Sequence, residues 1–547
     1  MMRCFLFIAA TLAFLIILAI ILWFGDNQPF GMIRHWSTEW PIYTSRLWPL
    51  LAVLIASLGF VAITANTLPP LTLPWRSACA LFVFLAVALS LLTVWGLRAF
   101  PNSGDEYAYI FQARTFLSGR LWNEVPPDPD LFAVSHVFAK DGRWISEYPP
   151  GWPGLLTIFG LGHLPFWLVN PLLGGLLLIS LAAFCRYRSG PTAAVVAVAL
   201  MGSTPFFLFN AASYFSQVPA ALFGLLFCHQ SLRWLDMPRA RTAISSGAAL
   251  GMLGLIRPFD VVFFAAPFAV EFVLRARRAH WSLMPVAILG GLPFLALYLG
   301  DNAAVTGNPL LPIVEWGSPL LQMGTHPIDE FGIARGLSDA LRLAVVHLLE
   351  LTEWTSPLLV IAYPAALLAM RRALSFSDFI FPATVVAYLF YPGFGGNEYG
   401  PRYYFEAFPL LVMTVALATA NLLGRARWRS WIRGLLLAHV LLCLVSFVIC
   451  GVFFRRIVDE RMDLQDQAGA NGGPGKAVIV VRSGTGIIRH MAPLDLVRNG
   501  TDLSGDVVFA HDLPGGETAL LAIFPDRKIY LYRRDPGMPR GTLTAMH

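Results

Sequence analysis

Long apolar segments recur through most of the chain, and this pattern limits its fold more than any other feature of the sequence. A segment of about 20 apolar residues is long enough to cross a hydrocarbon layer of about 30 Å. Of the 547 residues, 56% are hydrophobic and only 13% are charged, and the mean hydropathy is +0.63. These values are typical of a polytopic membrane protein, which needs no large soluble core.

We predict an all-α membrane domain over residues 1–454 with thirteen membrane-spanning helices. The first span, 5–24, follows Arg3 as in a signal peptide but lacks a small-residue cleavage site, so we expect an uncleaved anchor. The spans 243–256 and 259–274 are short and predict a broken or tilted hairpin. The remaining predicted spans are 47–66, 78–98, 154–183, 191–209, 217–235, 281–299, 355–370, 378–392, 406–422 and 434–454.

The arginines predict the orientation of the chain in the cytoplasmic membrane. They gather in alternate short connections, as expected for loops that stay inside, so the N-terminus is predicted to lie inside. The loop 101–153, which we call the first outer loop, and the residues after about 454 then lie outside. A net charge of +6 suits this orientation and does not indicate nucleic-acid binding. The arginines of the predicted inner connections are Arg76, Arg186, Arg188, Arg233, Arg239, Arg241, Arg275, Arg277, Arg278, Arg371, Arg372, Arg425, Arg427, Arg429 and Arg433.

Residues 455–547 differ in character from the rest of the chain. A glycine-rich break at 468–476 precedes four short β-like runs, which predict a small α/β or β domain outside the membrane. The runs are 477–481, 506–510, 519–524 and 528–534.

The first outer loop carries the strongest candidate for a catalytic site. Asp105 and Glu106 stand just beyond an apolar segment, and charge at the end of a membrane helix is often functional. Apolar residues at helical spacing over 107–117 predict an amphipathic helix in the membrane interface. A structural role for Asp105, as the N-cap of that helix, is the alternative.

Further charged and aromatic residues stand out in three other places. Arg402 and Tyr404 begin a late apolar segment, where both types can also anchor a helix at the headgroups. Arg257 lies in the broken hairpin, where it can pair with Asp260. His326 lies in the loop 300–354.

Several motifs in order resemble those of the GT-C glycosyltransferases. The Asp-Glu pair, the helix after it and EYPPGWP at 147–153 resemble the first outer loop of that superfamily. The resemblance covers 78–454 and is nearest to the protein O-mannosyltransferases, the lipid A aminoarabinose transferases and their family 39-like bacterial relatives. Supporting motifs are SYFSQVPAAL at 213–222, TGNPLLP at 306–312 and YGPRYYFEAFPLL at 399–411.

The resemblance implies transfer of a sugar from a polyprenyl-phosphate donor to a lipid, glycan or protein acceptor on the outer face of the membrane. A glycosyl phosphate already carries a good leaving group. The enzyme therefore needs one carboxylate to take the proton of the acceptor hydroxyl and cations to hold the departing phosphate. We expect Asp105 to be that base, with Glu106 positioning the acceptor or a metal.

The same resemblance suggests roles for the other candidates. Arg402, Tyr404 and Arg257 are expected near the donor phosphate, where the planar guanidinium suits two phosphate oxygens. Glu147 matches a glutamate linked to metal binding. Apart from the resemblance, His326 and Asp329 in the loop 300–354 could complete a divalent-metal site with it. The lysine that follows this glutamate in the aminoarabinose branch is replaced here by Tyr148, which brings no charge.

Two other classes of function fit parts of the sequence. A transporter or flippase of lipid-linked sugars would also carry arginines near membrane ends and a broken helix, but it usually has repeated halves, and no repeat is evident here. A membrane assembly protein could use residues 455–547 as a docking module. The candidates on one outer face favour the transferase.

Overall fold

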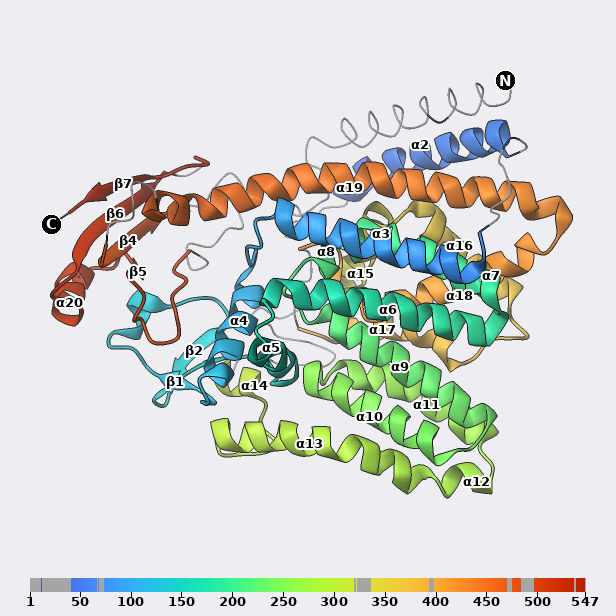
Figure 1. Ribbon diagram of the computed structural model, residues 1–547, viewed down its shortest axis with the longest axis horizontal. Coiled ribbons are helices and arrows are strands. Elements are labelled where there is room, and N and C mark those ends of the chain that lie inside the picture. Colours follow the sequence, from blue (N-terminus) through green and yellow to red (C-terminus); the bar gives the residue numbers. More distant parts are fainter. Residues whose placement is uncertain are drawn as a thin grey trace.

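A computed structural model describes residues 11, 41–65, 67, 73–318, 321, 336–392, 398–469, 475–483, 496–535 and 538–546. A helical bundle forms most of it, and a small sheet domain lies at one end (Figure 1). The helices of the bundle are α2 (Pro41–Thr64), α3 (Trp75–Gly96), α5 (Gly151–Leu161), α6 (Phe166–Ser189), α7 (Pro191–Gly202), α8 (Pro205–Ala211), α9 (Gln217–Asp236), α10 (Ala240–Ile256), α11 (Asp260–Arg275), α12 (Arg278–Trp281), α13 (Met284–Thr306), α14 (Ile313–Gly317), α15 (Leu337–Trp354), α16 (Pro357–Ala369), α17 (Ile380–Tyr388), α18 (Phe408–Leu423) and α19 (Ala426–Gly469).

Several helices are long and apolar enough to cross a membrane, but the predicted count of thirteen is not confirmed. Within the described residues, four single helices meet this criterion, or up to six spans if each of two sharply bent helix pairs is one. The predicted first span, 5–24, lies outside the described residues except for one position.

Breaks inside predicted spans account for part of the difference. The predicted span 154–183 is divided between α5 and α6, because the chain turns at His163, which has a φ of +58°, and Pro165 cannot continue a helix from the preceding turn. The predicted span 191–209 is also divided, since α7 and α8 meet at 72°. The expected break between residues 243 and 274 is confirmed by α10 and α11.

Glycines bring α10 and α13 close together. A Cβ on Gly247 would lie 1.7 Å from the carbonyl oxygen of Ala287, and one on Gly290 would lie 2.2 Å from that of Ile244. No larger residue fits at either position without moving a backbone. Such small-residue contacts let membrane helices pack closely where the hydrophobic effect gives little help.

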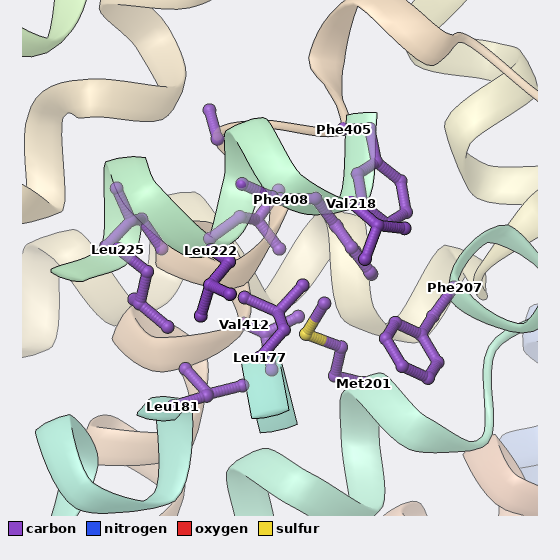
Figure 2. Close-up of a cluster of buried hydrophobic side chains, with 14 of the residues drawn as sticks. Leu177, Leu181, Met201, Phe207, Val218, Leu222, Leu225, Phe405, Phe408 and Val412 are labelled. Atoms are coloured by element: carbon purple, nitrogen blue, oxygen red, sulfur yellow. The ribbon is translucent and has the colours of Figure 1, made fainter. Parts of the chain in front are cut away.

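Large apolar side chains fill the centre of the bundle. Figure 2 shows residues of α6, α7, α8, α9 and α18 meeting there. Phe405 and Phe408 belong to this cluster and are 0% exposed. They hold the start of α18 in place, and the 3₁₀ turn η3 (Arg402–Tyr404) directly precedes it. The core thereby fixes the position of the candidate residues in η3.

The first outer loop folds into helix α4 (Gly104–Leu117) and a three-stranded sheet. The sheet has the order β1-β3-β2, with β1 at Asn123–Glu124, β2 at Val137–Lys140 and β3 at Arg143–Ser146. The predicted helix is confirmed, and most of its residues are buried against other parts of the protein. Its buried residues include Tyr107, which packs in one cluster with residues of the C-terminal sheet.

The longest helix, α19, connects the bundle to the C-terminal domain. Its 44 residues span about 66 Å at 1.5 Å per residue, and the helix continues past the boundary predicted at residue 454. A four-stranded sheet in the order β5-β4-β6-β7 follows it. The strands are β4 (Ala477–Ser483), β5 (Val507–His511), β6 (Lys528–Arg534) and β7 (Thr542–Ala545).

The C-terminal domain is therefore α/β, with one correction. The run 519–524, predicted as β-like, lies in helix α20 (Gly516–Ile523) and the turn after it. Strands β5 and β6 both pair parallel to β4, and parallel strands require a crossover, which is usually a helix. The apolar run alone did not distinguish a strand from a short buried helix.

Candidate active site

Helix α4 begins with a capping box that does not use Asp105. The Ser103 hydroxyl accepts a hydrogen bond from the Glu106 backbone N–H at 3.2 Å, and the Glu106 carboxylate accepts one from the Ser103 N–H at 3.1 Å. The alternative role of Asp105 as the N-cap is therefore wrong. Asp105 lies inside the first turn, where its side chain is left to make other contacts.

Glu106 is buried and accepts hydrogen bonds from three backbone N–H groups. Besides Ser103, the donors are Asn102 at 2.6 Å and Tyr214 at 2.8 Å. Burial raises the pKa of Glu106 to about 7, the Tyr214 N–H bond opposes this shift, and the charge of Glu398 adds to it. Glu106 thus joins α4 to the loop before α9, and it is 0% exposed.

Asp105, in contrast, faces a group of polar side chains and keeps 22% of its side chain exposed. Its Oδ1 accepts a hydrogen bond from the Tyr148 hydroxyl. Its Oδ2 lies 3.5 Å from Nη2 of Arg402 and 3.9 Å from Nε2 of His136. Burial would raise the pKa of Asp105, but the charges of Arg402 and His136 and the Tyr148 hydrogen bond hold it well below its usual range. Asp105 is therefore ionised at neutral pH.

Histidine 136 links two of the predicted acids, and the sequence analysis did not identify it. Its Nδ1 lies 2.8 Å from Oε1 of Glu147, while Nε2 faces Asp105. Its φ of +66° is uncommon for a residue other than glycine. The sequence does contain a signal for this contact: counting outward from the Asp141–Gly142 turn of the β2–β3 hairpin places His136 opposite Glu147.

Tyr148 belongs to the same group. Its ring stacks on Tyr109 with centroids 4.3 Å apart, and its hydroxyl donates to Asp105. The position therefore contacts the candidate base directly.

Arg402, in η3, contacts Asp105 and belongs to this group. Its Cζ lies 3.8 Å from the centroid of the Phe215 ring, and its side chain is 9% exposed. The neighbouring Tyr403 stacks on Tyr388 at 4.8 Å. Tyr404 is 1% exposed, and its ring contacts His347 at 5.6 Å, so it points into the bundle.

Arg257 pairs with acidic residues, as the alternative in the sequence analysis expected. Its Nε lies 3.0 Å from Oδ2 of Asp260 and 3.0 Å from Oε1 of Glu406. Its Nη2 donates to the Tyr388 hydroxyl at 3.0 Å. The side chain of Arg257 is 16% exposed. Its Cζ lies 6.0 Å from the ring centroid of Tyr403, the residue after Arg402.

The predicted metal site can be tested only in part. His326 lies outside the described residues. Glu147 is engaged by His136, and across the described portion of the chain no three His, Cys, Asp or Glu side chains come together as metal ligands. Among the described residues, Glu147 therefore pairs with His136 and is not part of a set of metal ligands.

Comparisons with known proteins give a consistent picture of the fold. The crystal structure of ArnT from Cupriavidus metallidurans bound to undecaprenyl phosphate is 12% identical, covers 85% of this chain and 97% of that chain, and has a TM-score of 0.55. The apo form of the same protein gives 12% identity, 83% and 92% coverage and a TM-score of 0.54. This chain has the GT-C fold.

Other comparisons add less. AglB from Archaeoglobus fulgidus, an archaeal oligosaccharyltransferase, is 12% identical over 74% of this chain and 62% of that chain, with a TM-score of 0.44. Residues 477–544 match a family described as a domain of unknown function, DUF7846. No curated protein matches the chain in sequence. The match to ArnT extends over nearly the whole length of that protein, so the likeness is one of complete architecture.

Proposed function

We propose that the protein is a glycosyltransferase that moves a sugar from a polyprenyl-phosphate donor to a hydroxyl of a lipid, glycan or protein acceptor at the outer face of the cytoplasmic membrane. The observation that carries the proposal is the group around Asp105. A partly exposed carboxylate, held ionised, stands beside a nearly buried arginine, Arg402, and a second arginine, Arg257, lies 6.0 Å from the ring centroid of the adjacent Tyr403. The GT-C fold and the undecaprenyl phosphate bound by ArnT support the choice of donor.

Asp105 acts as the general base. Its carboxylate accepts the proton of the acceptor hydroxyl while the acceptor oxygen attacks the anomeric carbon and the bond from that carbon to the donor phosphate breaks. A carboxylate with a low pKa is a weak base, which is sufficient because the acceptor hydroxyl becomes acidic as its oxygen bonds to the anomeric carbon. Tyr148 fixes the carboxylate through Oδ1, and Glu106 holds the helix that carries it.

Arg402 holds the donor phosphate and stabilises the charge that remains on it after the sugar leaves. Arg257 and Tyr403 form the next part of the same surface. Arg257 already faces Asp260 and Glu406, so its charge is balanced in part, and we assign it a secondary role. The inward position of Tyr404 leaves it supporting η3 rather than contacting the donor.

A direct assay tests the proposal. The purified full-length protein in lipid nanodiscs is incubated with a panel of polyprenyl-phosphate sugars, and donor cleavage and product formation are measured. The wild type should consume at least one donor, and Asp105→Asn should consume it about 10²- to 10⁴-fold more slowly. Movement of an intact donor across vesicle membranes by both proteins, without cleavage, would contradict the proposal and favour a transporter.

A further inference from the structure

The segment that leads from α3 into α4 has an unusual backbone. Arg98 and Ala99 both have left-handed conformations, with φ values of +58° and +50°. Two consecutive residues of this kind, neither of them glycine, are sparsely populated and persist only where the surrounding structure holds them. This segment, residues 97–103, leads directly into α4, in which Asp105 is the second residue, so its conformation affects where the carboxylate points.

The last turns of α19 contact the end of α3 and this segment at several points, from Gly96 to Asn102. Arg455 donates to the carbonyl oxygen of Gly96 at 2.8 Å, and Asp466 accepts two hydrogen bonds from Arg98 at 2.7 and 2.5 Å. Arg461, 6% exposed, donates to the side-chain oxygen of Asn102 at 3.3 Å. A helix that begins in the bundle thus ends beside the turn that precedes the candidate base (Figure 1).

The C-terminal domain holds the second half of the segment and the start of α4. Arg498 donates to the carbonyl oxygen of Pro101, and its Cζ lies 5.0 Å from the ring centroid of Phe100 and 5.6 Å from that of Tyr107. The Tyr107 hydroxyl donates to the carbonyl oxygen of Asn499 at 2.5 Å. Tyr107 follows Asp105 by two residues in the same helix.

Apolar packing adds to these polar contacts. The side of α4 that carries Tyr107 and Phe111 shares a single buried cluster with Val478, Val508 and Ile529 of the C-terminal sheet. The C-terminal domain therefore covers one side of α4 through apolar packing as well as through polar contacts.

We propose that the end of α19 and the C-terminal domain form a brace that positions Asp105, with Arg498 and Arg461 as positioning residues. This assigns a role to the region that matches a domain of unknown function. The inference rests on the proposed function only for its effect on turnover, because the effect on the segment 96–107 is independent of any reaction.

The test compares Arg498→Met and Tyr107→Phe with a matched control, Arg482→Met. Arg482 belongs to the same domain but pairs with Asp512 at the surface, where its side chain is 55% exposed. Tyr107→Phe removes one hydroxyl and keeps the ring, so it serves if Arg498→Met folds poorly. Arg498→Lys restores a donor and a cation.

Two readouts separate positioning from general stability. Hydrogen exchange of the amides of 96–107 should become faster in both variants, with the rest of the bundle and the unfolding temperature little changed. The turnover rate at saturating donor should fall by about 10- to 100-fold in Arg498→Met, as expected for a slightly misplaced catalytic group. The affinity for the donor should stay within about twofold of the wild-type value, since neither variant changes Arg402, which is proposed to contact the phosphate. Arg498→Lys should recover most of the rate, and Arg482→Met should match the wild type.

The outcomes distinguish the two proposals. If the wild type transfers sugar and Asp105→Asn does not, but both brace variants keep wild-type exchange and turnover, the brace is overturned. Faster exchange with unchanged turnover would also overturn its positioning role. If the wild type consumes no donor, the proposed function fails, and the exchange of 96–107 still decides whether the brace exists.

Discussion

Arg402 Nη2 lies 3.5 Å from Asp105 Oδ2, although 297 residues separate the two in the chain. The distance is at the long limit of a hydrogen bond, so the pair is held loosely. In the proposed reaction the same guanidinium faces the donor phosphate and keeps the base ionised. The same residue therefore affects both the affinity for the donor and the ionisation of Asp105.

Asp105→Asn should lower the turnover rate by about 10² to 10⁴, the usual contribution of a general base. Folding should be unaffected, because the capping box uses Ser103 and Glu106. Sugar transfer and the unfolding temperature are measured together. Asp130→Asn, at an exposed acid of the same loop, is the control, and near-wild-type transfer by Asp105→Asn would remove Asp105 as the base.

Arg402→Ala should weaken donor binding by about 1.5 to 3 kcal/mol, the range for a hydrogen bond to a charged group. Arg402→Lys should recover only part of the lost donor affinity. The planar guanidinium of arginine can contact two phosphate oxygens side by side, and an ammonium group cannot reproduce that geometry. Titration of a non-hydrolysable donor analogue measures both. Equal affinity for the donor analogue in the wild type and Arg402→Ala would show that Arg402 interacts with Asp105 but does not bind the donor.

The pH dependence of turnover should respond to Arg402. In the wild type the pKa of Asp105 lies well below its usual range, so loss of the base by protonation does not limit the rate at pH 5 to 8. Arg402→Gln removes a positive charge that opposes the effect of burial on Asp105, so the pKa of Asp105 should rise. The acid limb of the turnover rate at saturating donor should then move to higher pH. An unshifted limb would mean that Arg402 does not control the ionisation of Asp105.

Glu106→Ala should lower stability rather than act on turnover alone. It leaves the buried N–H groups of Asn102, Ser103 and Tyr214 without their acceptor, and each such loss costs about 1 to 3 kcal/mol. A lower unfolding temperature in detergent checks this. Glu124→Ala, at an exposed position, is the comparison, and equal unfolding temperatures for the two variants would contradict the role given to Glu106.

The predicted orientation can be checked in whole cells. Cysteines placed at Ser135 and Ser504 should both react with an impermeant thiol reagent, because the first outer loop and the C-terminal domain share one buried cluster. A cysteine at Arg427, in a predicted inner connection, should not react. Labelling at Arg427 alone would reverse the topology.

The sequence by itself determined the class of the protein and the region of its site. Long apolar runs indicate segments that lie in lipid. Lipid offers no hydrogen-bond partners for backbone polar groups, so such segments must form helices, in which these groups bond to one another. Asp105 was identifiable because a charge at the end of such a helix is costly unless it is used. The hairpin of β2 and β3 was not predicted, although its two-residue Asp141–Gly142 turn sets the register of its strands.

Only the tertiary structure decided which side chains meet. Arg402 reaches Asp105 because the packed core fixes η3, and nothing local in the sequence encodes that distance. The separate roles of Asp105 and Glu106, adjacent in the chain, follow from the direction in which each leaves the first turn of α4. The contact of Arg498 with Pro101 joins segments 397 residues apart. Such contacts arise from packing between distant elements, which periodicity and composition do not specify.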